Sequence, residues 1–72
     1  MTLQAKVLTV SDGVAGGTRA DKSGRALVEH LAAAGYDVVA HEVTGDGAGD
    51  VERALRALCD GFSGLVVTTG GT

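Results

Sequence analysis

The sequence predicts an α/β fold built around a parallel sheet. Apolar, β-branched runs alternate with segments of helical periodicity, in the order strand, helix, strand, helix, strand. Glycine-rich loops follow the strands. Strands that alternate with helices are usually parallel and joined by right-handed crossovers. With 72 residues and no internal repeat or linker, the chain is expected to form one βαβαβ unit.

The first two elements are a buried strand and an amphipathic helix. Residues 5–11, AKVLTVS, are almost continuously apolar, as expected of a strand covered on both faces. Residues 23–35, SGRALVEHLAAAG, carry apolar side chains along one helical face. Asp21 or Ser23 can cap the start of this helix, and Gly35 can supply a left-handed residue at its end.

The next three elements are a second strand, a second helix and a third strand. Residues 36–43, YDVVAHEV, are more polar and are expected nearer the sheet edge. Residues 50–61, DVERALRALCDG, form the clearest amphipathic helix. Its apolar stripe includes Cys59, which we expect to be a buried core residue rather than a reactive thiol. Residues 64–68, GLVVT, form the third strand.

The composition argues against several kinds of binding partner, targeting segment and cross-link. The net charge is −3 and no cluster of Lys or Arg is present, so neither nucleic acid nor a membrane surface is an expected partner. The apolar run near the N-terminus is shorter than a signal peptide or a membrane span requires. One cysteine allows no intrachain disulfide. The two histidines, His30 and His41, are expected at the surface of a cytoplasmic protein.

Three loops leave the carboxyl ends of the predicted strands, where open parallel sheets bind ligands. They contain Ser11–Gly13 with Gly16–Thr18, Thr44–Gly47, and Thr69–Thr72. All are built from Gly, Ser, Thr and Asp, whereas the loops at the opposite edge are not. Glycines let backbone N–H groups approach an anion and hydroxyls add donors, so this edge is the predicted site.

Two acidic residues complicate a simple phosphate site. Asp12 and Asp46 would repel an anion unless Mg²⁺ bridges carboxylate and phosphate, or unless a carboxylate accepts hydrogen bonds from an amino-heterocycle. Simpler roles are also open. Asp12 and Gly13 could form a plain turn after the strand, and Asp46 could cap the second helix, although Asp50 is better placed for that.

Taken together, VLTVSDGVAGGTRADKSG, TGD and LVVTTGGT resemble the N-terminal half of the molybdopterin-binding MoaB/MogA family. The resemblance covers the whole chain. It implies a three-layer α/β/α molybdopterin-binding fold, of which residues 1–72 would hold only the βαβαβ portion. These residues would be the N-terminal part of a single domain, truncated after the TTGGT loop. The family's continuation, which carries a second functional acid and an arginine, does not follow.

The resemblance also implies a function in molybdenum cofactor biosynthesis. The complete domain would be a molybdopterin adenylyltransferase that uses MgATP, typically a homotrimer, with a molybdenumtransferase as a candidate partner. Asp46 would be the acidic residue at the catalytic edge and would hold Mg²⁺, although Gly45 stands where the family usually has proline. The residues implied to cradle molybdopterin and its phosphate are Ser11, Asp12, Gly13, Thr69, Gly70, Gly71 and Thr72.

Three readings of function therefore stay open. The chain is the front half of an adenylyltransferase, a non-catalytic molybdopterin- or nucleotide-binding module or inactive fragment, or an unrelated structural βαβαβ domain. The sequence beyond Thr72 would separate the first two readings, and molybdopterin binding would separate both from the third.

Overall fold

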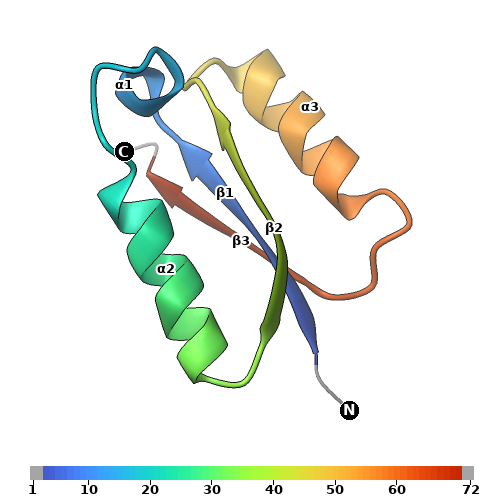
Figure 1. The fold of residues 1–72 in the computed structure, drawn as a ribbon. Helices are drawn as coiled ribbons and strands as arrows, with labels where there is room; N and C mark the ends of the chain where they lie inside the picture. Colours follow the sequence, from blue (N-terminus) through green and yellow to red (C-terminus); the bar gives the residue numbers. More distant parts are fainter. Residues whose placement is uncertain (1–2, 71–72) are drawn as a thin grey trace.

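The computed structural model describes residues 3–70 as three strands and three helices (Figure 1). The elements are β1 (Gln4–Val10), α1 (Asp12–Ala15), α2 (Lys22–Ala33), β2 (Asp37–Thr44), α3 (Ala48–Cys59) and β3 (Leu65–Gly70). The strands form one sheet in the order β2-β1-β3, and both neighbouring pairs are parallel. This arrangement confirms the predicted βαβαβ unit and places β2 at an edge of the sheet.

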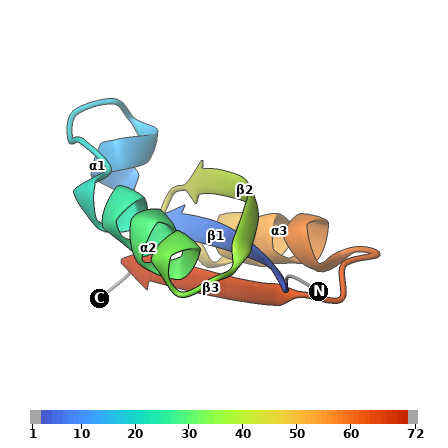
Figure 2. The ribbon, with the colours of Figure 1, turned by 60° about the horizontal axis from the view of Figure 1, so that its bottom comes forward.

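Helices α2 and α3 lie on opposite faces of the sheet, which gives three layers (Figure 2). Val7 of β1 packs with Leu31 of α2 in one core cluster. Leu8, the next residue, packs with Leu58 of α3 in the other. Because neighbouring side chains of a strand point to opposite faces, β1 supplies both cores from one short segment. That is why its sequence is apolar at almost every position.

The strand register brings the three carboxyl ends together. Val10, the last residue of β1, pairs with Thr44 of β2 on one side and with Gly70 of β3 on the other. The β3 strand is longer than the predicted 64–68 and continues through Thr69 and Gly70. The start of the predicted TTGGT loop is therefore part of the sheet, because its backbone pairs with β1.

An extra residue in β2 changes which face its side chains occupy. The pairing of β1 with β2 slips by one residue between Ala5 and Lys6, which leaves Val39 without a partner in β1. An inserted residue reverses the alternation of side chains beyond it. His41 accordingly lies on the face covered by α2, where it contacts Thr9. His41 is exposed, as predicted, and its ring in addition contacts Thr9.

Of the two predicted caps, Asp21 and Ser23, the structure has Asp21 as the N-cap of α2, which begins at Lys22. Asp21 Oδ1 accepts a hydrogen bond from the Gly24 amide at 2.9 Å, as an N-cap side chain does. Asp21 Oδ2 lies 2.8 Å from both Thr9 Oγ1, which donates to it, and His41 Nε2. We call these four residues, Thr9, Asp21, Gly24 and His41, the Asp21 cluster. The cluster joins the start of α2 to both β1 and β2.

Helix α3 departs from the prediction at both ends. It begins at Ala48, two residues early, with Gly47 as its N-cap and no side-chain cap. Asp50 lies in the first turn and pairs with Arg53, so neither Asp46 nor Asp50 caps the helix. Cys59 is exposed, which corrects the expectation of a buried thiol. It is the last helical residue and lies beside the stripe that faces the sheet.

Leu58 takes the buried position at this end of α3, with 5% of its surface exposed.

Within residues 3–70, no helix has both the length and the apolar character that crossing a bilayer requires.

Two glycines in the first turns of helices provide a matched test of the Asp21 cluster. A β-carbon at buried Gly24 would overlap Thr9 Oγ1 and both carboxylate oxygens of Asp21, whereas one at Gly49 would meet nothing within 4 Å. We expect Gly24→Ala to lower the free energy of unfolding by about 1–3 kcal/mol, because the cap and a buried hydrogen bond are lost. Gly49→Ala should be neutral or stabilising by up to about 1 kcal/mol.

Urea unfolding followed by circular dichroism measures both changes. Equal stability of the two variants would show that the cluster does not hold α2 to the sheet.

Candidate functional site

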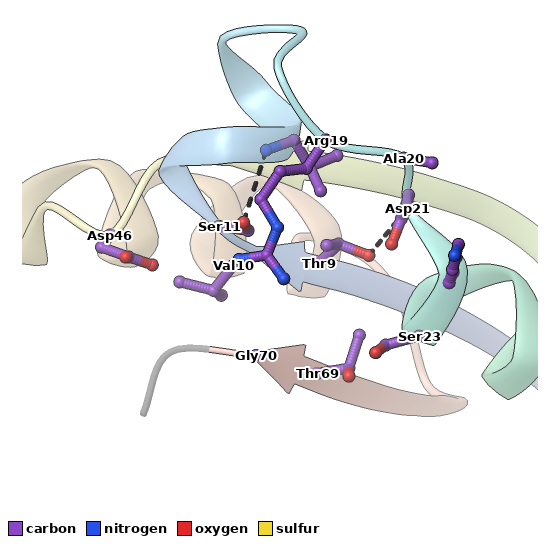
Figure 3. Close-up of a pocket in the computed structure, with 12 residues that line it drawn as sticks. Thr9, Val10, Ser11, Arg19, Ala20, Asp21, Ser23, Asp46, Thr69 and Gly70 are labelled. Carbon is purple, nitrogen blue, oxygen red and sulfur yellow. Dashed lines mark hydrogen bonds between the residues drawn. The ribbon is translucent and has the colours of Figure 1, made fainter.

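A cavity of about 420 Å³ opens at the carboxyl edge of the sheet, where the sequence predicts the site (Figure 3). It lies between the carboxyl ends of β1 and β3, the segment that joins α1 to α2, and the loop that joins β2 to α3. The residues that line it are Thr9, Val10, Ser11, Val14, Arg19, Ala20, Asp21, Lys22, Ser23, Asp46, Thr69 and Gly70.

Four of the eight predicted site residues line this cavity, namely Ser11, Asp46, Thr69 and Gly70. Asp12 and Gly13 are described by the structure but are not among the lining residues. Gly71 and Thr72 lie outside the described residues. The register of the parallel sheet therefore brings together one predicted residue after β1, one after β2 and two at the end of β3.

The predicted loop after β1 is folded at its start into the short helix α1. Ser11 is its N-cap, and the Val14 amide donates to Ser11 Oγ at 3.4 Å. The Ser11 amide in turn donates to the Thr44 carbonyl at 2.9 Å. Ser11 is thus held between β1 and β2 at the cavity wall, with its backbone position defined by the sheet.

The Asp12 carboxylate bonds to another loop of the protein. Its Oδ1 accepts a hydrogen bond at 2.8 Å from the Asp46 amide, across the gap between the first and second loops. A β-carbon at Gly45 would lie 2.7 Å from the same oxygen. A side chain at Gly45 would therefore displace the Asp12 carboxylate from the Asp46 amide. Asp12 holds the loop that carries Asp46, and Gly45 leaves room for it.

The Asp21 carboxylate lines the cavity but is already occupied by hydrogen bonds. Burial by itself would raise the pKa of Asp21, but hydrogen bonds from Thr9 and the Gly24 amide, with the neighbouring His41 ring, outweigh it and lower that pKa. Thr9, which donates one of these bonds, is 3% exposed. Asp21 is accordingly a structural anion in the cavity wall, with both oxygens engaged by the protein.

Gly70 adopts a backbone conformation that side chains disfavour, with φ of +89°. A β-carbon at this position would also overlap the carbonyl oxygen of Val10. The pairing of β3 with β1 therefore already requires glycine here. The close approach of these two backbones forms the floor of the cavity beside Thr69 (Figure 3).

The sequence reasoning missed the basic side of the cavity. Arg19 from the segment between α1 and α2, and Lys22 and Ser23 from the start of α2, line it. Within residues 3–70, neither Arg19 nor Lys22 takes part in an ion pair. The signal was present, because two basic residues stand among hydroxyl residues just before a helix. It was overlooked because the loops were marked by their Gly, Ser, Thr and Asp residues and not by basic ones.

No group of three His, Cys, Asp or Glu side chains in the described part of the chain is arranged to hold a metal ion. Asp46 is the exposed carboxylate at the cavity, since Asp12 faces the Asp46 amide and Asp21 is engaged in its cluster. A cation at this site would therefore take one ligand from Asp46 and further oxygen ligands from a bound phosphate.

Comparison with known proteins identifies relatives of the whole described fold. The family described as "Probable molybdopterin binding domain" matches residues 6–72. The chain is 39% identical over 71 residues to a molybdopterin adenylyltransferase of Pyrococcus furiosus, covering 99% of this chain and 41% of that protein. It is 35% identical to molybdenum cofactor biosynthesis protein B of Bacillus subtilis, covering 97% of this chain and 41% of that protein.

A solved structure agrees with this comparison. The crystal structure of the tungsten cofactor synthesizing protein MoaB from Pyrococcus furiosus superposes with a TM-score of 0.87 at 38% identity. The match covers 99% of this chain and 44% of that one. The fold predicted from the sequence is thus found in a related protein. The chain spans about two fifths of the length of the curated relatives it matches.

The Asp21 cluster generates a prediction about acid stability. Because the folded pKa lies below the ordinary value of 3.8, the carboxylate's contribution to stability is complete above that value. It is lost as the pH falls through the lowered pKa. We expect NMR titration of the Asp21 carboxyl carbon to show a midpoint below 3.8. Thr9→Val, which removes one donor, should raise that midpoint. A midpoint at or above the ordinary value would contradict this account of the cluster.

Proposed function

The chain belongs to the family of probable molybdopterin-binding domains, and from this membership we propose that it forms one part of a molybdopterin adenylyltransferase site. The proposed reaction transfers the adenylyl group of ATP to molybdopterin, as a step of molybdenum cofactor biosynthesis. The names of the two curated relatives support this assignment. The observation that carries it for this chain is the cavity at the carboxyl edge, because its lining suits a phosphate-bearing ligand.

Hydroxyl groups and backbone supply the neutral part of the proposed molybdopterin site. Ser11, Ser23 and Thr69 line the cavity and can donate hydrogen bonds to a heterocycle or a phosphate. Gly70 brings the backbone of β3 to the same wall, and we propose that Gly71 and Thr72 continue this contact. Ligand contact by Asp12 and Gly13 stays a prediction, since their observed contacts lie within the protein.

Asp46 is the residue that we propose for the catalytic edge. It is exposed at the cavity, and its backbone is held by the hydrogen bond to Asp12. Mg²⁺ commonly binds through one or two carboxylates together with substrate phosphates, so one carboxylate fits this ion if ATP supplies the remaining oxygens. When bound there, the ion would offset negative charge on the phosphates during transfer. The chain's own part is to hold the Asp46 carboxylate at a defined place beside the cavity.

The assembly and location of the protein are proposed from the resemblance. They comprise a homotrimer, a molybdenumtransferase as the candidate partner, and the cytoplasm. A non-catalytic molybdopterin-binding module is the second candidate, because the matching family is described by molybdopterin binding alone. Both candidates require molybdopterin to bind, and they differ in whether transfer follows.

Asp46→Asn tests the proposed catalytic role in the full-length protein. The change is nearly isosteric and leaves the Asp46 amide free to bond to Asp12. We expect molybdopterin affinity to stay within a few-fold, whereas adenylyl transfer falls about 10²-fold or more through loss of one preorganised charge. Asp37→Asn is the matched control, since this exposed acid lies at the opposite end of β2. It should change neither quantity.

Steady-state transfer rates and equilibrium binding of molybdopterin separate the outcomes. Full transfer with lost molybdopterin binding would make Asp46 a pterin ligand. No molybdopterin binding by the unmodified full-length protein would refute the proposed function itself.

A further inference from the structure

Two basic and two acidic side chains line the cavity, and within the described residues the basic ones form no ion pair with the acidic ones. Four charged side chains line it, namely Arg19, Asp21, Lys22 and Asp46. Asp21 is engaged by Thr9, the Gly24 amide and His41. The two cations take part in no ion pair in residues 3–70. Arg19 of the α1–α2 segment and Lys22 at the start of α2 therefore bring positive charge to a cavity that also offers hydroxyl groups.

The backbone around Gly13 fixes where Arg19 begins. The Gly13 carbonyl accepts hydrogen bonds from the Thr18 amide at 2.8 Å, the Thr18 hydroxyl at 3.1 Å and the Arg19 amide at 3.2 Å. These three bonds fold the segment after α1 back over that helix. Arg19 is thereby anchored through its own amide before its side chain extends.

Gly13 also leaves the space that the Arg19 side chain occupies. A β-carbon on Gly13 would lie 2.6 Å from Arg19 Cδ and 2.9 Å from Cγ. The aliphatic part of Arg19 thus packs against the bare backbone of Gly13. Figure 3 shows the guanidinium group directed from this segment toward the carboxyl ends of β1 and β3. The absence of a side chain at Gly13 therefore leaves room for this position of Arg19.

We propose that Arg19, seated on Gly13 and assisted by Lys22, is the anion-binding group of the cavity and receives a phosphate group of the ligand. A guanidinium presents several donors in one plane and can bind phosphate oxygens in pairs, whereas an ammonium acts as a point charge. The hydroxyls of Ser11, Ser23 and Thr69 line the same cavity and can complete the hydrogen bonds. This inference rests on the proposed function only for the identity of the phosphate ester.

The inference also orients the ligand. Asp46 enters the cavity from the loop between β2 and α3, on another side from Arg19 (Figure 3). The phosphate at Arg19 would therefore be bound without a metal ion, and the Asp46 carboxylate would face a different part of the ligand. The phosphate belongs either to molybdopterin or to ATP, and the chemistry at Arg19 is the same for both.

Inorganic phosphate is the first probe, and the full-length protein is the sample. We expect Arg19→Gln to weaken phosphate binding at least tenfold, as measured by NMR titration at low ionic strength. Arg25→Gln is the matched control, because Arg25 is an exposed arginine of α2 that does not line the cavity. It should change the dissociation constant by less than twofold. Circular dichroism verifies that each variant is folded.

Gly13→Ala tests the position of the Arg19 side chain separately from its charge. It keeps every charge but places a methyl group where the Arg19 side chain lies. We expect it to weaken phosphate binding several-fold, in the same direction as Arg19→Gln. A loss in Arg19→Gln that is matched by Arg25→Gln would indicate only a change in net charge and would overturn the inference. Absent phosphate binding by the unmodified protein, or unchanged binding in Arg19→Gln, would overturn it as well.

Titrations with molybdopterin and with MgATP then identify the source of the phosphate. Weaker binding of molybdopterin alone by Arg19→Gln assigns the pterin phosphate, and weaker binding of MgATP alone assigns the nucleotide. Either result supports the inference, whereas unchanged affinity for both overturns it. Failure of the proposed function looks different. In that case the unmodified protein binds no molybdopterin, while inorganic phosphate binding still depends on Arg19.

Discussion

The burial of β1 between two parallel neighbours and two helices is the constraint on which the rest of the structure depends. One seven-residue strand pairs with β2 and β3 and contributes to both core clusters. Thr9 is its only buried polar side chain in the described residues, and the hydrogen bond to Asp21 offsets the cost of removing the Thr9 hydroxyl from water. Because parallel pairing aligns the strands, the residue that ends β1 also determines where the loops of β2 and β3 begin.

The hydrogen bonds at this edge show how its aspartates are compatible with the proposed anion site. The three acids near the cavity have different tasks, set by their hydrogen bonds. Asp12 holds the amide of Asp46, and Asp21 joins α2 to the sheet. Asp46 is left as the exposed carboxylate of the cavity. Positive charge enters separately, through Arg19 and Lys22, so attraction of an anion does not require removal of the acids.

The glycines at this edge are required for different physical reasons, and only some of these reasons concern a ligand. Gly24 makes room for the Asp21 cluster, Gly45 for the Asp12 carboxylate and Gly13 for the Arg19 side chain. Gly70 is required by its positive φ and by the approach of β1. A glycine-rich loop is thus a sign of close packing around functional side chains as well as of backbone contact with a phosphate.

The sequence by itself determined the order of the elements, the parallel sheet, two candidate caps for α2 that include Asp21, and the edge that carries the cavity. These follow from periodicity and from local hydrogen bonding between residues close in the chain. The tertiary structure decided the rest. The extra residue Val39 turns His41 toward Asp21, and Asp12 bonds to an amide 34 residues away. The α1–α2 segment brings Arg19 over the cavity. Such contacts depend on how distant segments pack together, and no local pattern of residues specifies that.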